Sequence, residues 1–330
     1  MSHSTTASES PLSRPSRLHN LPASTGPFVA LIAMGVALTI MSPTFFTVTN
    51  LMNIGQQIAI LAVLAIGGTA VITLGGIDLS VGSVLALSGA VLGNLHVNHQ
   101  VNIWLAVAAA LAVGTIAGVV NGLLVEYGRL PAFIATLAMM SVARGLTLVV
   151  LDSRPLSGYP DAFRNLANYR IAGHVPMSVV IAVVCFVIAW AYFRWRASGR
   201  ALFAVGANYE VARLSGLPVR RLTISVYAVA GLLAAVGGIL MTARLGSASP
   251  QACVGFELDV IAAVVIGGAS LVGGYASIAG TAIGVLIIGV LRNGLNLLNV
   301  DSNWQQVVIG GVIAIAVLIE NLRRKKSSGA

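Results

Sequence analysis

Long apolar runs separated by short polar segments dominate this chain of 330 residues. The runs cover about 28–42, 54–74, 80–95, 103–125, 132–151, 176–195, 222–243, 257–272, 276–292 and 304–321. An α-helix needs roughly 20 mainly apolar residues to cross the hydrocarbon core of a membrane. The pattern therefore predicts an all-α, polytopic integral membrane protein with about ten transmembrane helices, short broken segments included.

Two of these predicted helices, 80–95 and 257–272, are short for a full crossing. Short apolar segments interrupted by glycine are typical of the broken helices that line transport pathways. Residues 75–82 and 267–274 share the pattern Gly-Gly-x-x-Leu-x-x-Gly. The similarity is either an internal repeat, which would mark a pair of broken segments of the same orientation, or a coincidence in a chain with 36 glycines.

Three further glycines, Gly114, Gly118 and Gly122, recur every fourth residue and therefore lie on nearly one face of a helix. Small residues let membrane helices approach closely. The spacing predicts a helix-packing face, with a gating hinge as the alternative.

The composition agrees with a membrane protein. Hydrophobic residues make up 57% of the chain and charged residues 9%, against about 45–50% and 25% in soluble domains. So few charges cannot cover the surface of a soluble globule of this size. A soluble enzyme, a disordered chain and a fibrous protein are therefore excluded.

The net charge of +9 reports orientation, not a nucleic-acid partner. With both termini on the inner side, inner segments carry 13 Arg and Lys residues and outer segments five. Because basic residues collect in cytoplasmic loops, we expect both termini to be cytoplasmic. Residues 1–26 are expected to form a disordered cytoplasmic tail without a cleavable signal, 27–322 the transmembrane domain, and 323–330 a basic tail.

Catalytic and metal-binding patterns are scarce. Only two lysines occur, both in the C-terminal tail, so the chain lacks the Gly-x-x-x-x-Gly-Lys-Ser/Thr loop that cradles nucleotide phosphates. His96 and His99 lie in an asparagine-rich loop and are interpreted as ordinary loop residues. We expect no cofactor, no metal and no catalytic residue.

Few ionisable side chains lie within the predicted spans. Arg144 is either a structural ion-pair or backbone contact or a pathway residue. Asp78 lies at a glycine-rich break, where it either accepts free N–H groups or lines a pathway. Glu257 and Asp259 open a predicted helix, where carboxylates favour the positive end of the helix dipole.

The inner polar loop at 196–221 contains the clearest local signal. Asn208 is a predicted N-cap for a short helix from Tyr209 to Leu214, and Gly216 would end it. Val205, Val211 and Leu214 would be available for docking into a partner's groove. The alternative is a solvated surface helix.

Several motifs in order resemble the permeases of bacterial ABC importers of the ribose, arabinose and xylose class, and most of all those for ribose. They are Gly76-Ile77-Asp78-Leu79-Ser80-Val81-Gly82-Ser83, Ala132-Phe133-Ile134-Ala135-Thr136-Leu137 with Arg144-Gly145, Gly206-Ala207-Asn208-x-Glu210-x-Ala212-Arg213-Leu214-Ser215-Gly216, Gly255-Phe256-Glu257-Leu258-Asp259 with the second glycine motif, and Asn293-Gly294-Leu295-Asn296. Together they span about 42–322.

This resemblance implies the permease domain of an importer in the bacterial inner membrane. Its partners would be a cytoplasmic ABC ATPase subunit, a periplasmic sugar-binding protein and a second permease copy, in a homodimer or heterodimer. The ATPase-coupling loop would comprise Gly206, Asn208, Glu210, Ala212, Arg213, Leu214, Ser215 and Gly216. Tyr209, Val211 and Tyr275 depart from the family pattern, and the first two bear on the fit to the ATPase.

We therefore expect a permease that moves a ribose-like monosaccharide by alternating access, with ATP hydrolysed by a separate subunit. Candidate pathway residues are Thr69, Thr73, Asp78, Ser80, Asn121, Thr136, Arg144 and Asn293. An ion-coupled secondary transporter is the main alternative, although intramembrane carboxylates are scarce. A membrane enzyme acting on lipid substrates would need a cluster of catalytic acids or bases.

Overall fold

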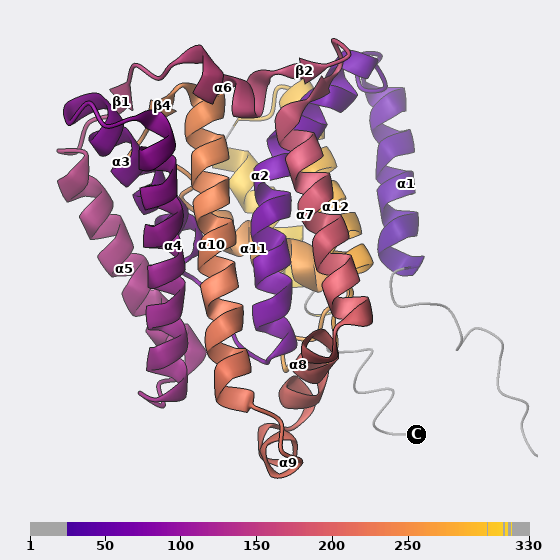
Figure 1. The fold of residues 1–330 in the computed structure, drawn as a ribbon. Coiled ribbons are helices and arrows are strands. Elements are labelled where there is room, and N and C mark those ends of the chain that lie inside the picture. The colour runs from indigo at the N-terminus through magenta and orange to yellow at the C-terminus, as the bar shows by residue number, and fades with distance from the viewer. Residues whose placement is uncertain (1–24, 302, 313, 316–317, 319–330) are drawn as a thin grey trace, which may run out of the picture.

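The computed structural model describes residues 25–301, 303–312, 314–315 and 318. Most of the tail expected over 1–26 and all of the basic tail over 323–330 lie outside these residues. The described part is a bundle of helices (Figure 1). The helices are α1 (Thr25–Met41), α2 (Val48–Thr73), α3 (Val81–Gly93), η2 (Asn94–Asn98), α4 (Ile103–Glu126), α5 (Ala132–Val150), α6 (Asp161–Asn168), α7 (Met177–Trp195), α8 (Ala197–Ala207), α9 (Tyr209–Leu214), α10 (Val219–Leu245), α11 (Phe256–Ile266) and α12 (Ile278–Leu297).

The all-α membrane fold is confirmed. Seven described helices are long and apolar enough to cross a membrane, with α3 and η2 forming one of them. The other predicted runs appear as the shorter helices α1 and α11 and as the helical residues 303–312. The chain is thus a multi-pass membrane protein.

Some predicted boundaries were wrong. Helix α2 begins at Val48, not at 54, because the Thr47 side chain caps it by accepting a hydrogen bond from the Asn50 amide. Helix α11 ends at Ile266, not at 272, because the glycine motif behind it turns the chain. The polar segments at 152–175 and 196–221 each contain a helix that the hydrophobic pattern did not predict, α6 in the first and α8 in the second.

The two ends of the bundle differ, as Figure 1 shows. One end, called the α6 end below, carries α6 and four two-residue strands. They are β1 (Leu156–Ser157), β2 (Arg170–Ile171), β3 (Val175–Pro176) and β4 (Ser247–Ala248). Antiparallel pairing joins β1 to β4 and β2 to β3. The opposite end, called the α9 end, carries α8 and α9.

Helix α2 forms the centre of the bundle. Every residue from Ala59 to Thr73 is buried, because α7, α10, α11 and α12 pack around it. Helices α5 and α7 instead expose large apolar side chains such as Val149 and Ile188. Apolar surface of this kind suits contact with lipid.

The three glycines of α4 form a packing face against α10, which confirms the packing interpretation of their spacing. A Cβ at Gly122 would lie 2.8 Å from the Ile224 Cα, and one at Gly118 would collide with the Tyr227 carbonyl oxygen. On the α10 side of the contact lies Gly231, where a Cβ would be 2.9 Å from the Gly118 Cα. The two backbones therefore approach too closely for a side chain at the crossing.

We expect Gly118→Val to destabilise the fold by about 1–3 kcal/mol or more, because overpacking a tight contact forces the backbones apart. Thermal unfolding of the purified protein in detergent, followed by tryptophan fluorescence, measures the effect. Gly35→Val in α1 is the control, since a Cβ at Gly35 meets nothing within 4 Å. Equal unfolding temperatures for the two variants would refute the packing argument.

Candidate coupling segment and transport pathway

Helices α8 and α9 form a compact projection at the α9 end. Asn208 has an extended backbone and its Oδ1 accepts a hydrogen bond from the Val211 amide at 3.0 Å, which caps α9. Gly216 has a φ of +82° and ends the helix, with the amides of Gly216 and Leu217 bonded to the carbonyls of Arg213 and Ala212. The sequence prediction of a capped helix from Tyr209 to Leu214 is confirmed.

The exposed face of α9 mixes apolar and charged side chains. Val211 and Leu214 are 59% and 77% exposed, whereas Ala212 is buried against the bundle. Glu210 and Arg213 form an ion pair at 2.8 Å on the exposed surface. The expectation that Val205 is available for docking was wrong, because α8 buries it in the cluster that includes Ala70 and Val71 of α2.

Tyr209 ties α9 to the end of α4. Its hydroxyl donates a hydrogen bond of 2.6 Å to Glu126 Oε1. Arg220 lies 3.9 Å from the same carboxylate oxygen and above the ring of Tyr127, 5.5 Å from its centroid. Tyr209, which departs from the family pattern, thus links the projection to the end of α4.

We expect Tyr209→Phe to slow transport by roughly threefold, because it removes one hydrogen bond worth about 1 kcal/mol or less at this exposed site. The bond to Glu126 raises the pKa of Tyr209. Because this pKa is raised, the contribution of the Tyr209–Glu126 hydrogen bond is fully present below the ordinary tyrosine pKa of about 10. It is lost only as the pH rises through the raised pKa. Uptake rates of the variant should therefore show the same deficit across the neutral range. Tyr169→Phe, at an exposed tyrosine next to α6 at the opposite end, is the control. A deficit that vanishes between pH 6 and 8 would contradict this role.

A junction of glycines joins α8 to the interior. A Cβ at Gly206 would collide with the Thr73 carbonyl oxygen at the end of α2 and would lie 2.6 Å from the Gly274 amide nitrogen. The Gly274 amide donates a 2.9 Å hydrogen bond to the same Thr73 oxygen. A Cβ at Gly273 would lie 2.7 Å from the Gly75 nitrogen and 2.9 Å from the Gly206 oxygen. The projection thus approaches both glycine motifs closely at backbone atoms.

The two glycine motifs end their helices in the same way. Helix α2 is followed by Gly75 at a φ of +81°, and α11 by Gly268 at +91°. In both, the last turn closes through amides bonded to carbonyls three and five residues earlier. The contacts of Gly273 with Gly75 bring the two motifs together. The register differs by one residue, because the structure matches Gly75 with Gly268 and not with Gly267.

Four pathway candidates gather around the extended segment between α2 and α3. Asp78 Oδ1 accepts from the Ser80 amide at 2.8 Å and from the Ser80 hydroxyl at 2.6 Å. Asn121 of α4 donates to the Ser80 hydroxyl at 2.9 Å, and Thr136 of α5 donates to the Ile77 carbonyl at 3.0 Å. All four side chains are buried. In this conformation these side chains stabilise the segment between α2 and α3 by hydrogen bonds, as the interpretation of Asp78 as an acceptor predicted.

The remaining candidates lie elsewhere. Thr73 donates to the Thr69 carbonyl, and Thr69 contacts the Thr281 hydroxyl at 2.8 Å, inside the α2–α12 contact. Arg144 donates to the carbonyls of Pro250 and Ala252, so its structural contact is with backbone. Asn293 exchanges two 2.9 Å hydrogen bonds with Asn50 of α2. The structure therefore does not bring all the candidates together.

Sequence reasoning missed an intramembrane ion pair. Asp259, expected only to favour a helix terminus, is buried and accepts a hydrogen bond from Arg292 of α12. The two residues are 33 positions apart, and no local pattern links them. Its carboxylate thus joins α11 to α12.

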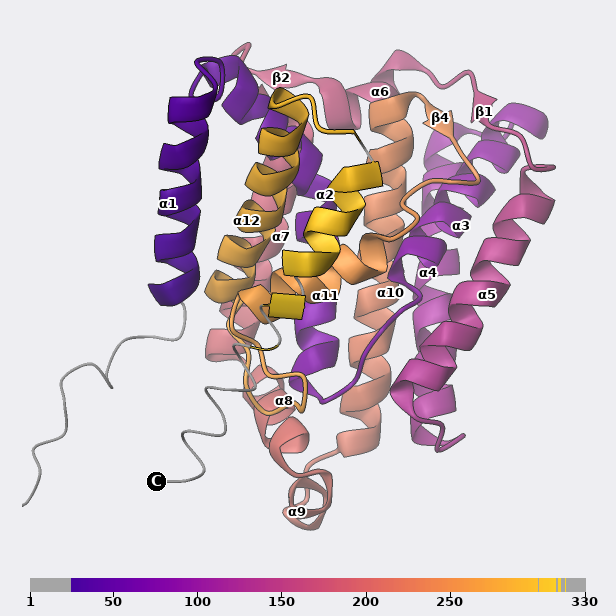
Figure 2. The same cartoon turned by 180° about the vertical axis from the view of Figure 1, so that it is seen from behind.

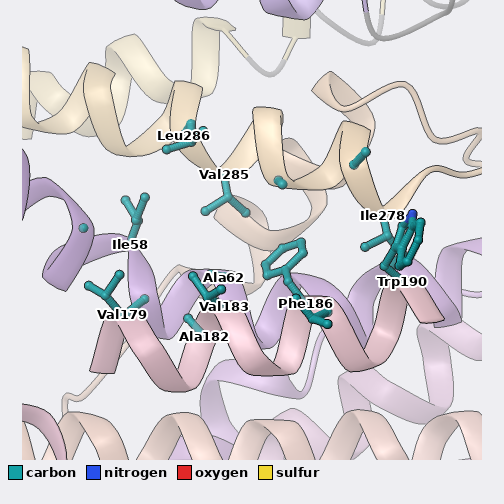
Figure 3. Close-up of a pocket in the computed structure, with 15 residues that line it drawn as sticks. Ile58, Ala62, Val179, Ala182, Val183, Phe186, Trp190, Ile278, Val285 and Leu286 are labelled. Carbon is teal, nitrogen blue, oxygen red and sulfur yellow. The ribbon is translucent and has the colours of Figure 1, made fainter. Parts of the chain in front are cut away.

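Two hollows differ sharply in chemistry. A cleft of about 820 Å³ opens at the α9 end between Tyr209, Arg213, Arg220, Arg129 and the Gly75 turn. A groove of about 450 Å³ between α2, α7 and α12 is lined by apolar side chains such as Ile58, Phe186 and Leu286, with the Trp190 indole at one end (Figure 3). A polar solute fits the first and not the second.

Among the described residues, no group of three or more His, Cys, Asp or Glu side chains is placed to hold a metal ion. The polar groups that the fold brings together are suited to hydrogen bonding and to backbone support.

Comparison with known proteins identifies the family. Residues 50–317 match the family described as branched-chain amino acid transport system / permease component. The chain is 47% identical over 300 residues to the ribose import permease protein RbsC of Escherichia coli K12, covering 90% of this chain and 93% of that protein. It is 45% identical over 305 residues to RbsC of Bacillus subtilis 168, covering 92% and 93%.

A more distant relative is the L-arabinose ABC transporter permease protein AraH of Azospirillum brasilense, which is 33% identical over 301 residues, covering 91% of this chain and 88% of AraH. Such coverage leaves no large part of the permease domain unmatched. The chain therefore belongs to the family of transport-system permease components that includes the ribose import permeases, and it is a transport subunit of the sugar ABC importer type, not an enzyme.

Proposed function

We propose that this chain is the membrane pore of an ATP-driven importer for a ribose-like monosaccharide. The observation that carries the proposal is the glycine junction, in which an exposed, capped helix at one end is joined by backbone contacts to two breaks inside the bundle. An exposed helix connected in this way is suited to pass a push from a partner to the transport pathway. The similarity to ribose import permeases supports the substrate class.

The α9 end is proposed to face the cytoplasm, with both termini on that side. It carries the basic residues Arg129, Arg194, Arg196, Arg200, Arg213, Arg220 and Arg221. The positive-inside rule favours this orientation. The α6 end then faces the periplasm, where a sugar-binding protein would deliver the solute.

The proposed partner at the α9 end is an ABC ATPase subunit. Val211 and Leu214 would enter a groove of that subunit, and the ion pair of Glu210 and Arg213 would form polar contacts at its rim. Gly206, Asn208, Ala212, Ser215 and Gly216 would shape the segment and support it from behind. ATP-driven movement of α9 would then shift the Gly75 and Gly273 turns.

The break between α2 and α3 is the proposed moving part of the pathway. Asp78, Ser80, Asn121 and Thr136 hold it in the present arrangement, and Thr73 lies at its start. Arg144 would hold the loop at 249–253 near the periplasmic side, and Asn293 would fix α12 to α2. A second permease copy, identical or similar, would complete the pore.

Uptake into proteoliposomes tests this proposal. Liposomes holding the permease, its ATPase and its binding protein should accumulate radiolabelled D-ribose only when ATP is present inside the compartment that the ATPase faces. A protonophore should leave the rate unchanged. Uptake that persists without the ATPase and collapses with the protonophore would establish the ion-coupled alternative instead.

A further inference from the structure

A polar cavity of about 250 Å³ lies among the helices and opens to the surface at Asn296, which is exposed. It is separate from the glycine junction and from the cleft at the α9 end. It is lined by residues of α2, the end of α10, α11, α12 and the helical residues 303–312 (Figure 2). Its polar lining consists of Gln57, Arg244, Asp259, Arg292, Asn296 and Gln305. Arg244 lies three residues before β4, which places the cavity toward the α6 end.

The charges in this cavity are unusual for a membrane interior. Arg292 pairs with the buried carboxylate of Asp259 and lies over the Phe256 ring, 5.9 Å from its centroid. Within the described residues no carboxylate lies at salt-bridge distance from Arg244. Ionisable groups at membrane depth are costly and mark routes for polar solutes.

The amides add both donors and acceptors. Gln305 donates to the Asn296 side-chain oxygen at 2.8 Å and to the Val300 carbonyl at 2.9 Å. In the part of the chain that the structure describes, this leaves the Asn296 amide nitrogen and the Gln305 side-chain oxygen without a protein partner. The lining of the cavity thus carries a free amide donor on Asn296, a free amide acceptor on Gln305 and the guanidinium of Arg292.

The volume and the chemistry together define the ligand class. A cavity of this size lies below the range of about 300–1,000 Å³ that drug-sized ligands occupy. Each hydroxyl of a sugar both donates and accepts, and therefore matches a mixture of guanidinium, carboxylate and amide groups. Ile58, Leu61 and Phe256 add apolar surface to the same lining. The net charge of the site, two guanidinium groups against one carboxylate, is too small to require an anion.

We propose that this cavity binds one monosaccharide molecule during its passage through the permease. The inference rests on the proposed import function and adds the place within the protein where the sugar is held. The groups that contact the sugar would be Gln57, Asn296 and Gln305, with Arg244 and the Arg292–Asp259 pair behind them.

Chemical labelling tests occupancy directly. In a chain carrying Cys185→Ala and Cys253→Ala, Asn296→Cys is treated in nanodiscs with a small, neutral, water-soluble thiol reagent. High concentrations of D-ribose should slow the labelling at least threefold, whereas glycerol at the same osmolarity should not. An equal labelling rate with and without D-ribose would overturn the proposal.

Transport by two neighbouring glutamine variants tests the role of the cavity. Gln57→Leu should lower the number of D-ribose molecules imported per ATP at least tenfold, because a sugar hydroxyl loses its partner, while binding-protein-stimulated ATP hydrolysis stays within twofold of wild type. Gln57→Asn should restore part of the loss. Gln56→Leu is the matched control, because the Gln56 amide bonds instead to Asn168 and to the Ala167 carbonyl.

The outcomes separate the two proposals. If Gln57→Leu imports as many sugars per ATP as Gln56→Leu, the cavity does not hold the sugar in transit, although the import function stands. If the wild-type permease shows no ATP-dependent uptake of D-ribose, the proposed function fails before the cavity is tested.

Discussion

Gly206→Val is expected to abolish ATP-driven sugar uptake while the protein stays in the membrane and still binds its ATPase. The valine Cβ would collide with the Thr73 carbonyl oxygen and lie 2.6 Å from the Gly274 nitrogen, and both of those atoms belong to backbone. Neither can move aside without disturbing an end of α2 or the turn after α11. Overpacking at such a site costs about 1–3 kcal/mol, enough to separate α8 from both breaks.

The control lies on the same helix. Ala204 is exposed on α8, so Ala204→Val adds bulk without meeting the interior. Uptake by the two variants is compared at equal membrane abundance, together with co-purification of the ATPase. The ATPase should remain bound to the Gly206 variant, because the outer face of α9 is unchanged. Normal uptake by Gly206→Val would show that the junction does not transmit movement.

Glu210→Arg is expected to abolish uptake for a different reason, which is loss of the ATPase itself. Glu210 is paired with Arg213 on the exposed face of α9, so the present pair is neutral. Reversing its charge places two positive charges one helical turn apart, on the surface proposed to enter the partner. Exposed ion pairs contribute about 0–1 kcal/mol to stability, so the fold should survive the change.

A matched control exists at the opposite end of the molecule. Asp161 and Arg164 form an exposed ion pair at 3.7 Å with the same spacing in α6. Asp161→Arg should leave ATPase binding intact, whereas Glu210→Arg should reduce co-purified ATPase to background. Wild-type uptake and full ATPase binding by Glu210→Arg would remove α9 from the coupling role.

Local signals in the sequence predicted the local structures well. The cap of α9 by Asn208, its end at Gly216 and the shortness of α11 follow from residue types that act within a few positions. The prediction that 80–95 is too short to cross the membrane was wrong, because η2 extends α3 to a span of 18 residues. Hydrophobic runs predicted the transmembrane helices because a membrane demands their length. The α4 glycines predicted a packing face because their spacing matches the helical repeat.

Features that depend on distant contacts could not be predicted in this way. The burial of Val205 depends on where α8 meets α2, and the α8 helix itself has no long apolar run. The pair of Asp259 and Arg292 and the amide pair of Asn50 and Asn293 join residues 33 and 243 positions apart. The sequence contains the partners but not the packing that brings them together.

Site-directed cross-linking tests the central claim that the α9 end binds the ATPase and is moved by it. In a chain carrying Cys185→Ala and Cys253→Ala, Leu214→Cys bears a short photoactivatable cross-linker on α9, and Arg170→Cys bears it at the α6 end. The assembled importer is illuminated and the adducts are identified by mass. We expect Leu214→Cys to capture the ATPase subunit and Arg170→Cys to capture the sugar-binding protein. Capture of the ATPase through Arg170→Cys, with none through Leu214→Cys, would contradict the account.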